Sequence, residues 1–118
     1  MVSGANRGIG AALAERFHSD GWALSLGARN REELEESVTR WGDDNVRCYH
    51  YDALNSSTAY AWVEETLSDF GRIDGLTNNA GVGHMESLSD LSEEILDEMW
   101  SVNVKGPLRL IQRTLPHL

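Results

Sequence analysis

The sequence predicts an α/β fold in which a parallel sheet and its connecting helices form one domain. Short apolar runs rich in β-forming residues alternate with amphipathic stretches in units of about 25 residues, which is the pattern of βαβ connections. Glycine, asparagine and aspartate residues separate the units. With 118 residues, of which 41% are hydrophobic, the chain suits a single domain over residues 1–118 and leaves little room for a second.

The first two helices enclose a short strand. A helix is expected over residues 8–20, ended by Gly21, and a strand is expected over residues 22–27. The apolar stripe of this helix consists of Ile9, Leu13 and Phe17. A second helix is expected over residues 31–41, where glutamates favour the first turns. Its apolar stripe consists of Leu34, Val38 and Trp41, and its end is formed by Gly42, Asp43 and Asp44.

The middle of the chain repeats this pattern. A strand is expected over residues 46–51, which are rich in β-formers, and Asp52 follows it directly. The next helix has apolar positions at Ala59, Val63, Leu67 and Phe70 and is closed by Gly71. A short strand over residues 73–77 then runs into Asn78-Asn79-Ala80-Gly81, where asparagine and glycine tolerate the backbone angles of a tight turn.

The last helix is expected to start at Ser92, whose hydroxyl suits a helix N-cap, with Glu93 and Glu94 in the first turn. Its apolar positions are Ile95, Met99, Val102 and Ile111. Gly106-Pro107 is expected to kink this helix, because proline interrupts helical hydrogen bonding.

A glycine-rich segment stands where the first strand turns into the first helix. It reads Ser3-Gly4-Ala5-Asn6-Arg7-Gly8-Ile9-Gly10, with its glycines in the pattern G-x-x-x-G-x-G. Glycines allow a tight turn and a close approach to a pyrophosphate, which the N–H groups and dipole of the following helix attract. The pattern predicts a dinucleotide site, and the alternative is a turn whose glycines serve packing only.

The end of the second strand indicates which dinucleotide is bound. A site for NAD carries an acid there, about 20 residues after the glycines, to bind the ribose hydroxyls. This chain has Ala28-Arg29 and no acid at that point. Arg29, together with Arg7, would instead pair with a 2′-phosphate, so the sequence favours NADP(H) over NAD(H). The alternative is that both arginines are ordinary surface charges.

These motifs together resemble the N-terminal half of the short-chain dehydrogenase/reductase family. The family's T-G-x-x-x-G-x-G pattern is present with Ser3 in place of threonine, and its Asn-Asn-Ala-Gly signature is complete at residues 78–81. Asp52 matches the acid that binds the adenine amine. Asn103 matches the catalytic asparagine of the fourth helix, which helps to hold a water of the proton relay. The resemblance implies a Rossmann-type fold, a doubly wound parallel sheet in a three-layer αβα arrangement with strand order 3-2-1-4.

The resemblance also implies the residues of the site. The cofactor-binding residues are Ser3, Gly4, Asn6, Arg7, Gly8, Ile9, Gly10, Arg29, Asp52, Ala53, Asn79, Ala80 and Gly81. Asn103 is the catalytic residue among those present. Simpler roles stay open, with Asp52 as a turn residue, Asn78 and Asn79 as ties between strands, and Asn103 as an amide that satisfies a kinked backbone. His84 either faces the substrate cleft or is a solvated loop residue.

The family's reaction is hydride transfer between the nicotinamide and a carbonyl or alcohol carbon, with a tyrosine as acid/base and a lysine four residues later. No tyrosine of this chain has a lysine at that spacing, and the only lysine is Lys105. Only Met1 and Val2 precede Ser3, whereas a strand commonly has about five residues. The chain is therefore expected to be the cofactor-binding half of an NADP(H)-dependent oxidoreductase, incomplete at both ends and inactive alone.

Two other functions stay open. One is a natural half-domain that binds a nucleotide as a sensor or scaffold without catalysis. The other is a phosphoacceptor receiver domain, which shares the size, the acidic charge and the βα alternation. A receiver needs an acidic pair just after its first strand, where this chain has Gly4 and Gly8, while Asp43-Asp44 precede the third strand.

Composition narrows the location and the partners. Ten Lys and Arg against nineteen Asp and Glu give a net charge of −9, the wrong sign for binding nucleic acid or an anionic membrane. The single cysteine, Cys48, cannot form an internal disulfide, and no Cys/His cluster has the spacing of a zinc site. We expect a cytoplasmic protein without a metal, whose partner is a small carbonyl or alcohol substrate. The parent protein is expected to be a homo-oligomer, because the family commonly pairs through its helices.

Overall fold

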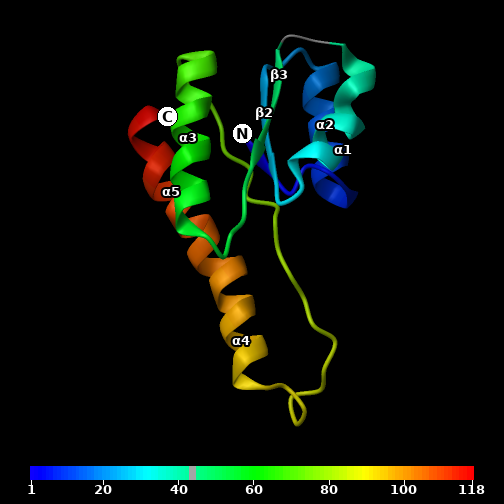
Figure 1. The fold of residues 1–118 in the computed structure, drawn as a ribbon, viewed down its shortest axis with the longest axis vertical. Helices are drawn as coiled ribbons and strands as arrows, with labels where there is room; N and C mark the ends of the chain where they lie inside the picture. The colour runs from blue at the N-terminus through cyan, green and yellow to red at the C-terminus, as the bar shows by residue number, and fades with distance from the viewer. Residues whose placement is uncertain (43–44) are drawn as a thin grey trace.

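The computed structural model describes residues 1–42 and 45–118, so the helix end and acidic pair noted at Asp43 and Asp44 lie outside the described residues. The elements in chain order are β1 (Val2–Ser3), α1 (Gly8–Ser19), β2 (Leu24–Ala28), α2 (Arg31–Val38), the 3-10 turn η1 (Thr39–Trp41), β3 (Val46–His50), α3 (Ser56–Phe70), α4 (Glu93–Trp100), the π-helical turn η2 (Ser101–Lys105), α5 (Gly106–Thr114) and the 3-10 turn η3 (Leu115–His117). Helices α3 and α5 cover one face of the parallel sheet, and α1 and α2 cover the other (Figure 1). The predicted three-layer αβα fold is thereby confirmed. No helix in the described part of the chain is both long and apolar enough to span a membrane.

The sheet has the predicted strand order, with β1 in its interior. Val2 pairs with Leu26 of β2, which in turn pairs with Cys48 of β3. On its other side Val2 forms a parallel bridge with Thr77. The full strand predicted over residues 73–77 is wrong, because the segment is reduced to this single bridge. The reason is that β1 has only two residues with which a neighbouring strand can pair.

The strand predicted from Trp22 begins two residues later, at Leu24. The N–H of Trp22 donates to the carbonyl of Phe17, and the N–H of Gly21, whose φ is +83°, donates to that of His18. These two bonds form a Schellman ending, in which the residue after the glycine packs back on the helix. The rings of Phe17 and Trp22 accordingly meet edge-to-face at 6.3 Å. Trp22 therefore closes α1 and is not part of β2.

The apolar stripe predicted for α1 is wrong at its first position, because 74% of Ile9 is exposed. Gly10 and Ala14 are the buried residues of this helix. Small residues at the contact allow the helix to approach the sheet closely, and larger Leu13 and Phe17 lie half-buried at the sides. Ile9 is left free to face the ligand end of the sheet.

Each face of the sheet has its own core. The cluster under α1 and α2 consists of Val2, Ala5, Ala14, Leu24, Leu26, Ala28, Leu34 and Cys48. The cluster under α3 and α5 consists of Tyr49, Tyr51, Ala53, Ala59, Trp62, Val63, Ile73, Val102 and Leu110. The Trp62 ring occupies the space above Gly27, where a Cβ would lie 2.7 Å from it, and its Nε1 donates to Ser25 Oγ at 2.8 Å. Ser25 also shares a hydrogen bond with Thr66, so the polar atoms of this core are satisfied.

The last helical run is interrupted where the sequence predicts a kink. Ser92 caps α4 as predicted, since its Oγ accepts a hydrogen bond from the N–H of Ile95 at 3.3 Å. The run then widens into η2, where the N–H of Gly106 donates five residues back to Ser101. Pro107 stands in the first turn of α5, so the irregular turn lies just before the Gly106-Pro107 pair. In Figure 1, α4 projects beyond the sheet beside the long segment that precedes it.

Candidate functional site

A cavity of about 390 Å³ opens at the carboxyl ends of the three strands. Ligands of open α/β sheets bind at these ends, where the chain leaves the strands. The residues that line the cavity are Gly4, Asn6, Arg7, Gly8, Ile9, Ala28, Arg29, Asn30, Glu33, Tyr51, Asp52, Ala53, Leu54, Asn79, Ala80, Gly81, Val82, Glu98 and Val102.

This lining contains every cofactor-binding residue predicted from the sequence except Ser3 and Gly10. Both of these residues are buried. Asn103 does not line the cavity, but its neighbour Val102 does. The side chain of Asn103 bonds to Val82, which is part of the lining. The structure therefore gathers the predicted residues around one cavity, although they come from five separate stretches of the chain.

The glycine segment leads from β1 into α1 through conformations that favour glycine. Gly4 has a φ of +66° and Gly8 a φ of +56°, both in the left-handed region. A Cβ on Gly10 would lie 2.1 Å from the carbonyl oxygen of Gly4, so only glycine fits there. Arg7 is the N-cap of α1 in an extended conformation, and the first-turn N–H groups of the helix begin at the cavity wall. A helix N-terminus in this position is suited to an anionic group such as a pyrophosphate.

The Asn-Asn-Ala-Gly turn is fastened to the glycine segment by Ser3. The N–H groups of Asn79 and Ala80 both donate to Ser3 Oγ at 3.0 Å. The amide Nδ2 of Asn79 also donates to the carbonyls of Ser3, at 3.0 Å, and Gly4, at 3.2 Å. Asn79 thus acts as a tie between neighbouring strands while also lining the cavity.

Asp52 begins the turn that forms the next part of the wall. Its Oδ1 accepts a hydrogen bond from the N–H of Leu54 at 3.0 Å, and its backbone N–H donates to Thr58 Oγ1 at 3.0 Å. Asp52 is therefore a turn residue, and its carboxylate still lines the cavity. Ala53 and Leu54 follow it along the same wall.

Charges of both signs line the cavity. The positive side chains are Arg7 and Arg29, and the negative ones are Glu33, Asp52 and Glu98. Glu33 is a residue that the sequence analysis missed. Its Oε1 accepts a hydrogen bond from Asn6 Nδ2 at 3.2 Å, which joins α2 to the glycine segment. Asn30 was missed as well, although its place three residues before Glu33 is a readable N-cap signal, and its Oδ1 accepts from the Glu33 N–H at 3.1 Å.

Asn103 holds the chain just after the signature turn. Its Nδ2 donates to the carbonyl of Val82 at 2.8 Å, and its Oδ1 accepts from the N–H of the same residue at 2.9 Å. A Cβ on Gly81 would lie 3.2 Å from this Oδ1, so the turn approaches the amide closely. Pro107 cannot supply the N–H that an α-helix would direct to the carbonyl of Asn103. The side chain therefore positions the wall of the cavity, and the water-holding role predicted for Asn103 stays a prediction.

His84 lies beside the cavity rather than in its lining. Its Nε2 is 3.5 Å from a carboxylate oxygen of Glu98, and its Nδ1 is 3.8 Å from one of Glu86. Because Glu98 lines the cavity, His84 contacts the wall from outside.

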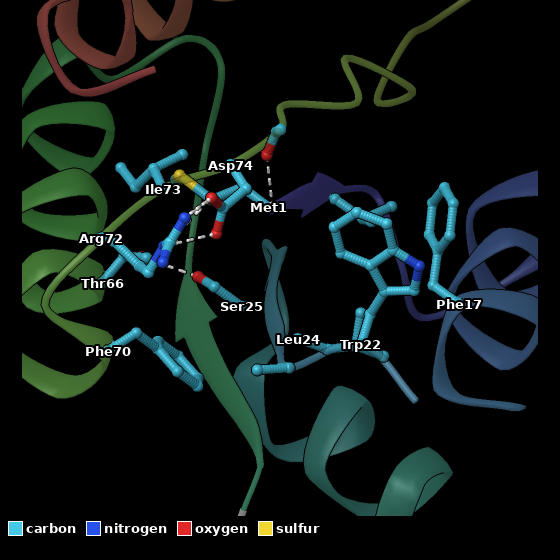
Figure 2. A pocket seen from close by; sticks show the side chains of 13 residues that line it. Met1, Phe17, Trp22, Leu24, Ser25, Thr66, Phe70, Arg72, Ile73 and Asp74 are labelled. Carbon is cyan, nitrogen blue, oxygen red and sulfur yellow. Dashed lines mark hydrogen bonds and ion pairs between the residues drawn. The ribbon is translucent and has the colours of Figure 1, made fainter. Parts of the chain in front are cut away.

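A second cavity of about 260 Å³ lies at the opposite ends of the strands and has mainly apolar walls (Figure 2). Phe17, Trp22, Leu24 and Phe70 point into it, and Met1 closes one side. None of the predicted site residues belongs to it. Cys48 is buried in the core under α1 and α2, and burial raises its pKa to about 11, which keeps the thiol protonated and unreactive. Within the described residues, no group of His, Cys, Asp and Glu side chains is placed to hold a metal ion.

The whole chain, residues 1–118, matches the family model of short chain dehydrogenases. It is 40% identical over 119 residues to an agropine synthesis reductase of Rhizobium rhizogenes, and 34% identical over 118 residues to an uncharacterized oxidoreductase of Staphylococcus saprophyticus. These matches cover 100% of this chain but only 27% and 48% of the two relatives. The chain thus spans half or less of the length of these relatives.

Solved structures give the same picture. A short-chain dehydrogenase/reductase of Brucella melitensis, described as a glucose/ribitol dehydrogenase, is similar with a TM-score of 0.95 and 32% identity over 99% of this chain and 50% of its own. An alcohol dehydrogenase of the archaeon Thermococcus sibiricus, complexed with 5-hydroxy-NADP, has a TM-score of 0.93 and 35% identity over 99% of this chain and 51% of its own.

Proposed function

Because this chain belongs to the short chain dehydrogenase family, we propose that it is the cofactor-binding half of an NADP(H)-dependent oxidoreductase. The whole protein would reduce a carbonyl or oxidise an alcohol. The nicotinamide cofactor supplies the hydride or accepts it. The residues of this chain bind and orient the cofactor, while the tyrosine and lysine of the family's reaction are not found at their spacing in residues 1–118.

The observation that carries this proposal is the joining of two turns around one cavity. Asn79 holds the signature turn against the glycine segment through two hydrogen bonds of 3.0 Å, donated by its backbone N–H to Ser3 Oγ and by its Nδ2 to the Ser3 carbonyl. Gly4 and Gly8 adopt left-handed conformations, and Gly10 leaves no room for a Cβ. These features fit a dinucleotide, because the pyrophosphate needs a close backbone approach and N–H donors at a helix start.

The preference for NADP(H) rests on the basic residues of the cavity. Arg29 directly follows β2, and Arg7 lies opposite in the glycine segment, both in the cavity lining. A guanidinium suits a 2′-phosphate because its fork of donors matches phosphate oxygens. The ring Nδ1 of His50 lies 2.9 Å from the carbonyl of Arg29 and steadies the backbone there. The carboxylates of Glu33, Asp52 and Glu98 in the same lining oppose a phosphate, so the preference depends on the arginines outweighing them.

The test is a titration of the purified chain with NADPH and NADH, followed by calorimetry or by quenching of tryptophan fluorescence. We expect Arg29→Ala to weaken NADPH about 10- to 100-fold, the value of a charge-assisted hydrogen bond, and to leave NADH unchanged. Ala28→Asp should shift the preference toward NADH. Arg31→Ala is the matched control, because Arg31 pairs with Glu35 at 2.7 Å and does not line the cavity. Equal affinity of the wild-type chain for both cofactors would refute the NADP(H) preference.

A second candidate function is a nucleotide-binding module that acts as a sensor or scaffold without catalysis. It is favoured by the cofactor-binding motifs of residues 1–118, which can hold a nucleotide without a catalytic pair. The sequence of the gene on either side discriminates between the two functions, because the oxidoreductase requires a serine and a Tyr-x-x-x-Lys to follow.

The partners and the location of the whole protein are part of the proposal. We infer a small carbonyl or alcohol substrate, a homo-oligomer and a place in the cytoplasm. The net charge of −9 argues against nucleic acid and anionic membranes as partners.

A further inference from the structure

One helical run holds two distant parts of the cavity wall. Asn103, in η2, bonds to Val82 beyond the signature turn. Arg109, in α5, donates from Nη1 to the carbonyl of Ala53 at 2.9 Å, a contact between residues 56 positions apart. Val102 of the same run lines the cavity between them. The run therefore contacts the wall both at the signature turn and at the turn of residues 51–54.

The contact of Arg109 is partly buried and backed by close packing. A Cβ on Gly106 would lie 2.8 Å from the Cβ of Ala53 and 3.1 Å from the hydroxyl of Tyr51, so α5 lies directly against the turn. Tyr51 is buried, and burial raises its pKa to about 12 although the Arg109 charge opposes the shift. The guanidinium thus contacts the turn at the Ala53 carbonyl, while α5 packs on the Tyr51 hydroxyl through Gly106.

One backbone bond ties the start of the turn to the sheet, since the N–H of Tyr51 donates to the carbonyl of Ala28 at 2.9 Å. Beyond it, the N–H groups of Leu54 and Asn55 both bond back to Asp52, and the N–H of Asp52 bonds to Thr58. These later bonds are local and fix only the shape of the turn. Arg109 adds a charged donor from the helical layer at the Ala53 carbonyl, beyond the point that the sheet holds.

We propose that Arg109 is a positioning residue of the adenine side of the cofactor site, which holds the Asp52–Ala53 turn at binding distance through the Ala53 carbonyl. The inference rests on the proposed function, because Asp52 and Ala53 matter only if the cavity takes an adenine dinucleotide. Arg109 acts through the backbone of the turn and does not itself line the cavity.

The test compares Arg109→Met with Arg113→Met in the 118-residue chain. Methionine keeps an apolar stem and removes the donor. Arg113 is the matched control, because it lies one turn further along α5 and stacks on Tyr60 at 4.0 Å, away from the turn. Arg109→Lys, which keeps a charged donor, tests for rescue. Urea unfolding of each variant shows whether it folds.

Two readouts follow. Hydrogen exchange of the ligand-free chain reports the amides of Asp52, Leu54 and Asn55, which are bonded within the turn. Calorimetry reports binding of NADPH, of adenosine 2′,5′-bisphosphate and of reduced nicotinamide mononucleotide. We expect Arg109→Met to speed exchange at these amides and to weaken the two adenine ligands about 5- to 10-fold, with the mononucleotide unchanged and partial recovery in Arg109→Lys.

The outcomes separate the inference from the proposed function. If the wild-type chain binds NADPH and Arg109→Met behaves like Arg113→Met, the inference alone is overturned. Equal weakening of the mononucleotide and the adenine ligands would show a general structural role and would also overturn it. If the wild-type chain binds none of the three ligands, the proposed function fails and the inference fails with it.

Discussion

Ser3 and Asn79, 76 residues apart in the chain, hold each other by side chain and backbone at once. Ser3 Oγ accepts the backbone N–H of Asn79, and Asn79 Nδ2 donates to the Ser3 carbonyl, each at 3.0 Å. Only 1% of Ser3 is exposed, so water cannot readily replace its hydroxyl. The pair closes the cavity between the glycine segment and the signature turn, and everything proposed for the site depends on it.

Replacing Ser3 by alanine should therefore destabilise the chain. The N–H groups of Asn79 and Ala80 would lose their acceptor, and an unsatisfied, partly buried donor costs about 1–3 kcal/mol of the free energy of unfolding. Urea unfolding measures the loss. Ser19→Ala is the control, because the Ser19 hydroxyl bonds to Glu15 on the exposed face of α1. A midpoint for Ser3→Ala equal to that of Ser19→Ala would contradict the importance of the pair.

Gly10→Ala should open the glycine segment. The added Cβ would lie 2.1 Å from the Gly4 carbonyl oxygen and 2.5 Å from Asn79 Nδ2, so backbone must move. Such overpacking costs about 1–3 kcal/mol, and the displaced turn should abolish detectable NADPH binding. Gly83→Ala is the matched control, since its Cβ would meet nothing within 4 Å. Calorimetry measures NADPH binding by both variants. Retained NADPH affinity in Gly10→Ala would show that the glycine segment does not contact the cofactor.

The sequence predicts those features that depend on neighbouring residues. The cap at Ser92, the glycine segment and the order of helices and strands up to α3 all follow from local spacing, and the structure has them. Trp22 shows the limit of such signals. An apolar residue after a glycine looks the same whether it starts a strand or packs back on a helix, and only the contact with Phe17 decides.

The remaining features of the site depend on contacts between distant segments. The hydrogen bond of Glu33 to Asn6 spans 27 residues, and that of Arg109 to Ala53 spans 56. Neither has a periodic pattern that the sequence could display. The position of residues 73–77 beside β1 was predictable from the resemblance, but the length of their pairing was not, because it depends on the two-residue extent of β1.

When the 118 residues are prepared with a free amino terminus, the ammonium group of Met1 should make the stability of this chain depend on pH. Burial lowers its pKa from 8.0 to about 6, with Asp74 opposing the shift, and it donates to the Gly75 carbonyl at 2.8 Å (Figure 2). Between these two pKa values the unfolded chain binds the proton and the folded chain does not, so stability rises with pH from about 6 to 8, by about 2 kcal/mol. Below about pH 6 the folded state carries the full cost of the buried charge.

Acetylation of Met1 isolates the contribution of the ammonium group to the free energy of unfolding. The acetylated chain keeps an N–H for Gly75 but has no charge to bury. The acetylated chain should be about 2 kcal/mol more stable than the free chain near pH 5.5, and the two should converge near pH 8.5. Urea unfolding at both pH values measures the difference. Parallel pH profiles for the two chains would show that the ammonium is not the cause.

The 118 residues alone should bind NADPH without oxidising it. Tyr49, Tyr51 and Tyr60 have no lysine four residues later. Burial also raises the pKa of Tyr49, with its hydrogen bond to Asp69 adding to the shift, so this phenol cannot act as a base near neutral pH. NADPH oxidation with a panel of small aldehydes and ketones, in chain freed of host reductases, is the measurement. Sustained turnover that Asn103→Ala abolishes would overturn this expectation.

The isolated chain should associate through its last helical run. Trp100 is 55% exposed, Ile111 45% and Leu115 65%, which places several large apolar side chains in water along α4, α5 and η3. Apolar patches of this kind favour contacts between copies, because burying each side chain contributes about 1.5–3 kcal/mol. Ile95 and Met99 of the same helical run are half-buried, so they contribute less to this apolar surface. Sedimentation at increasing concentration should show oligomers, and the double variant Trp100→Ser with Ile111→Ser should remove them.

The control is Leu88→Ser, at a side chain 90% exposed on the preceding loop, which should leave association unchanged. A wild-type chain that stays monomeric at every concentration would show that the exposed apolar side chains of α4 and α5 do not drive association.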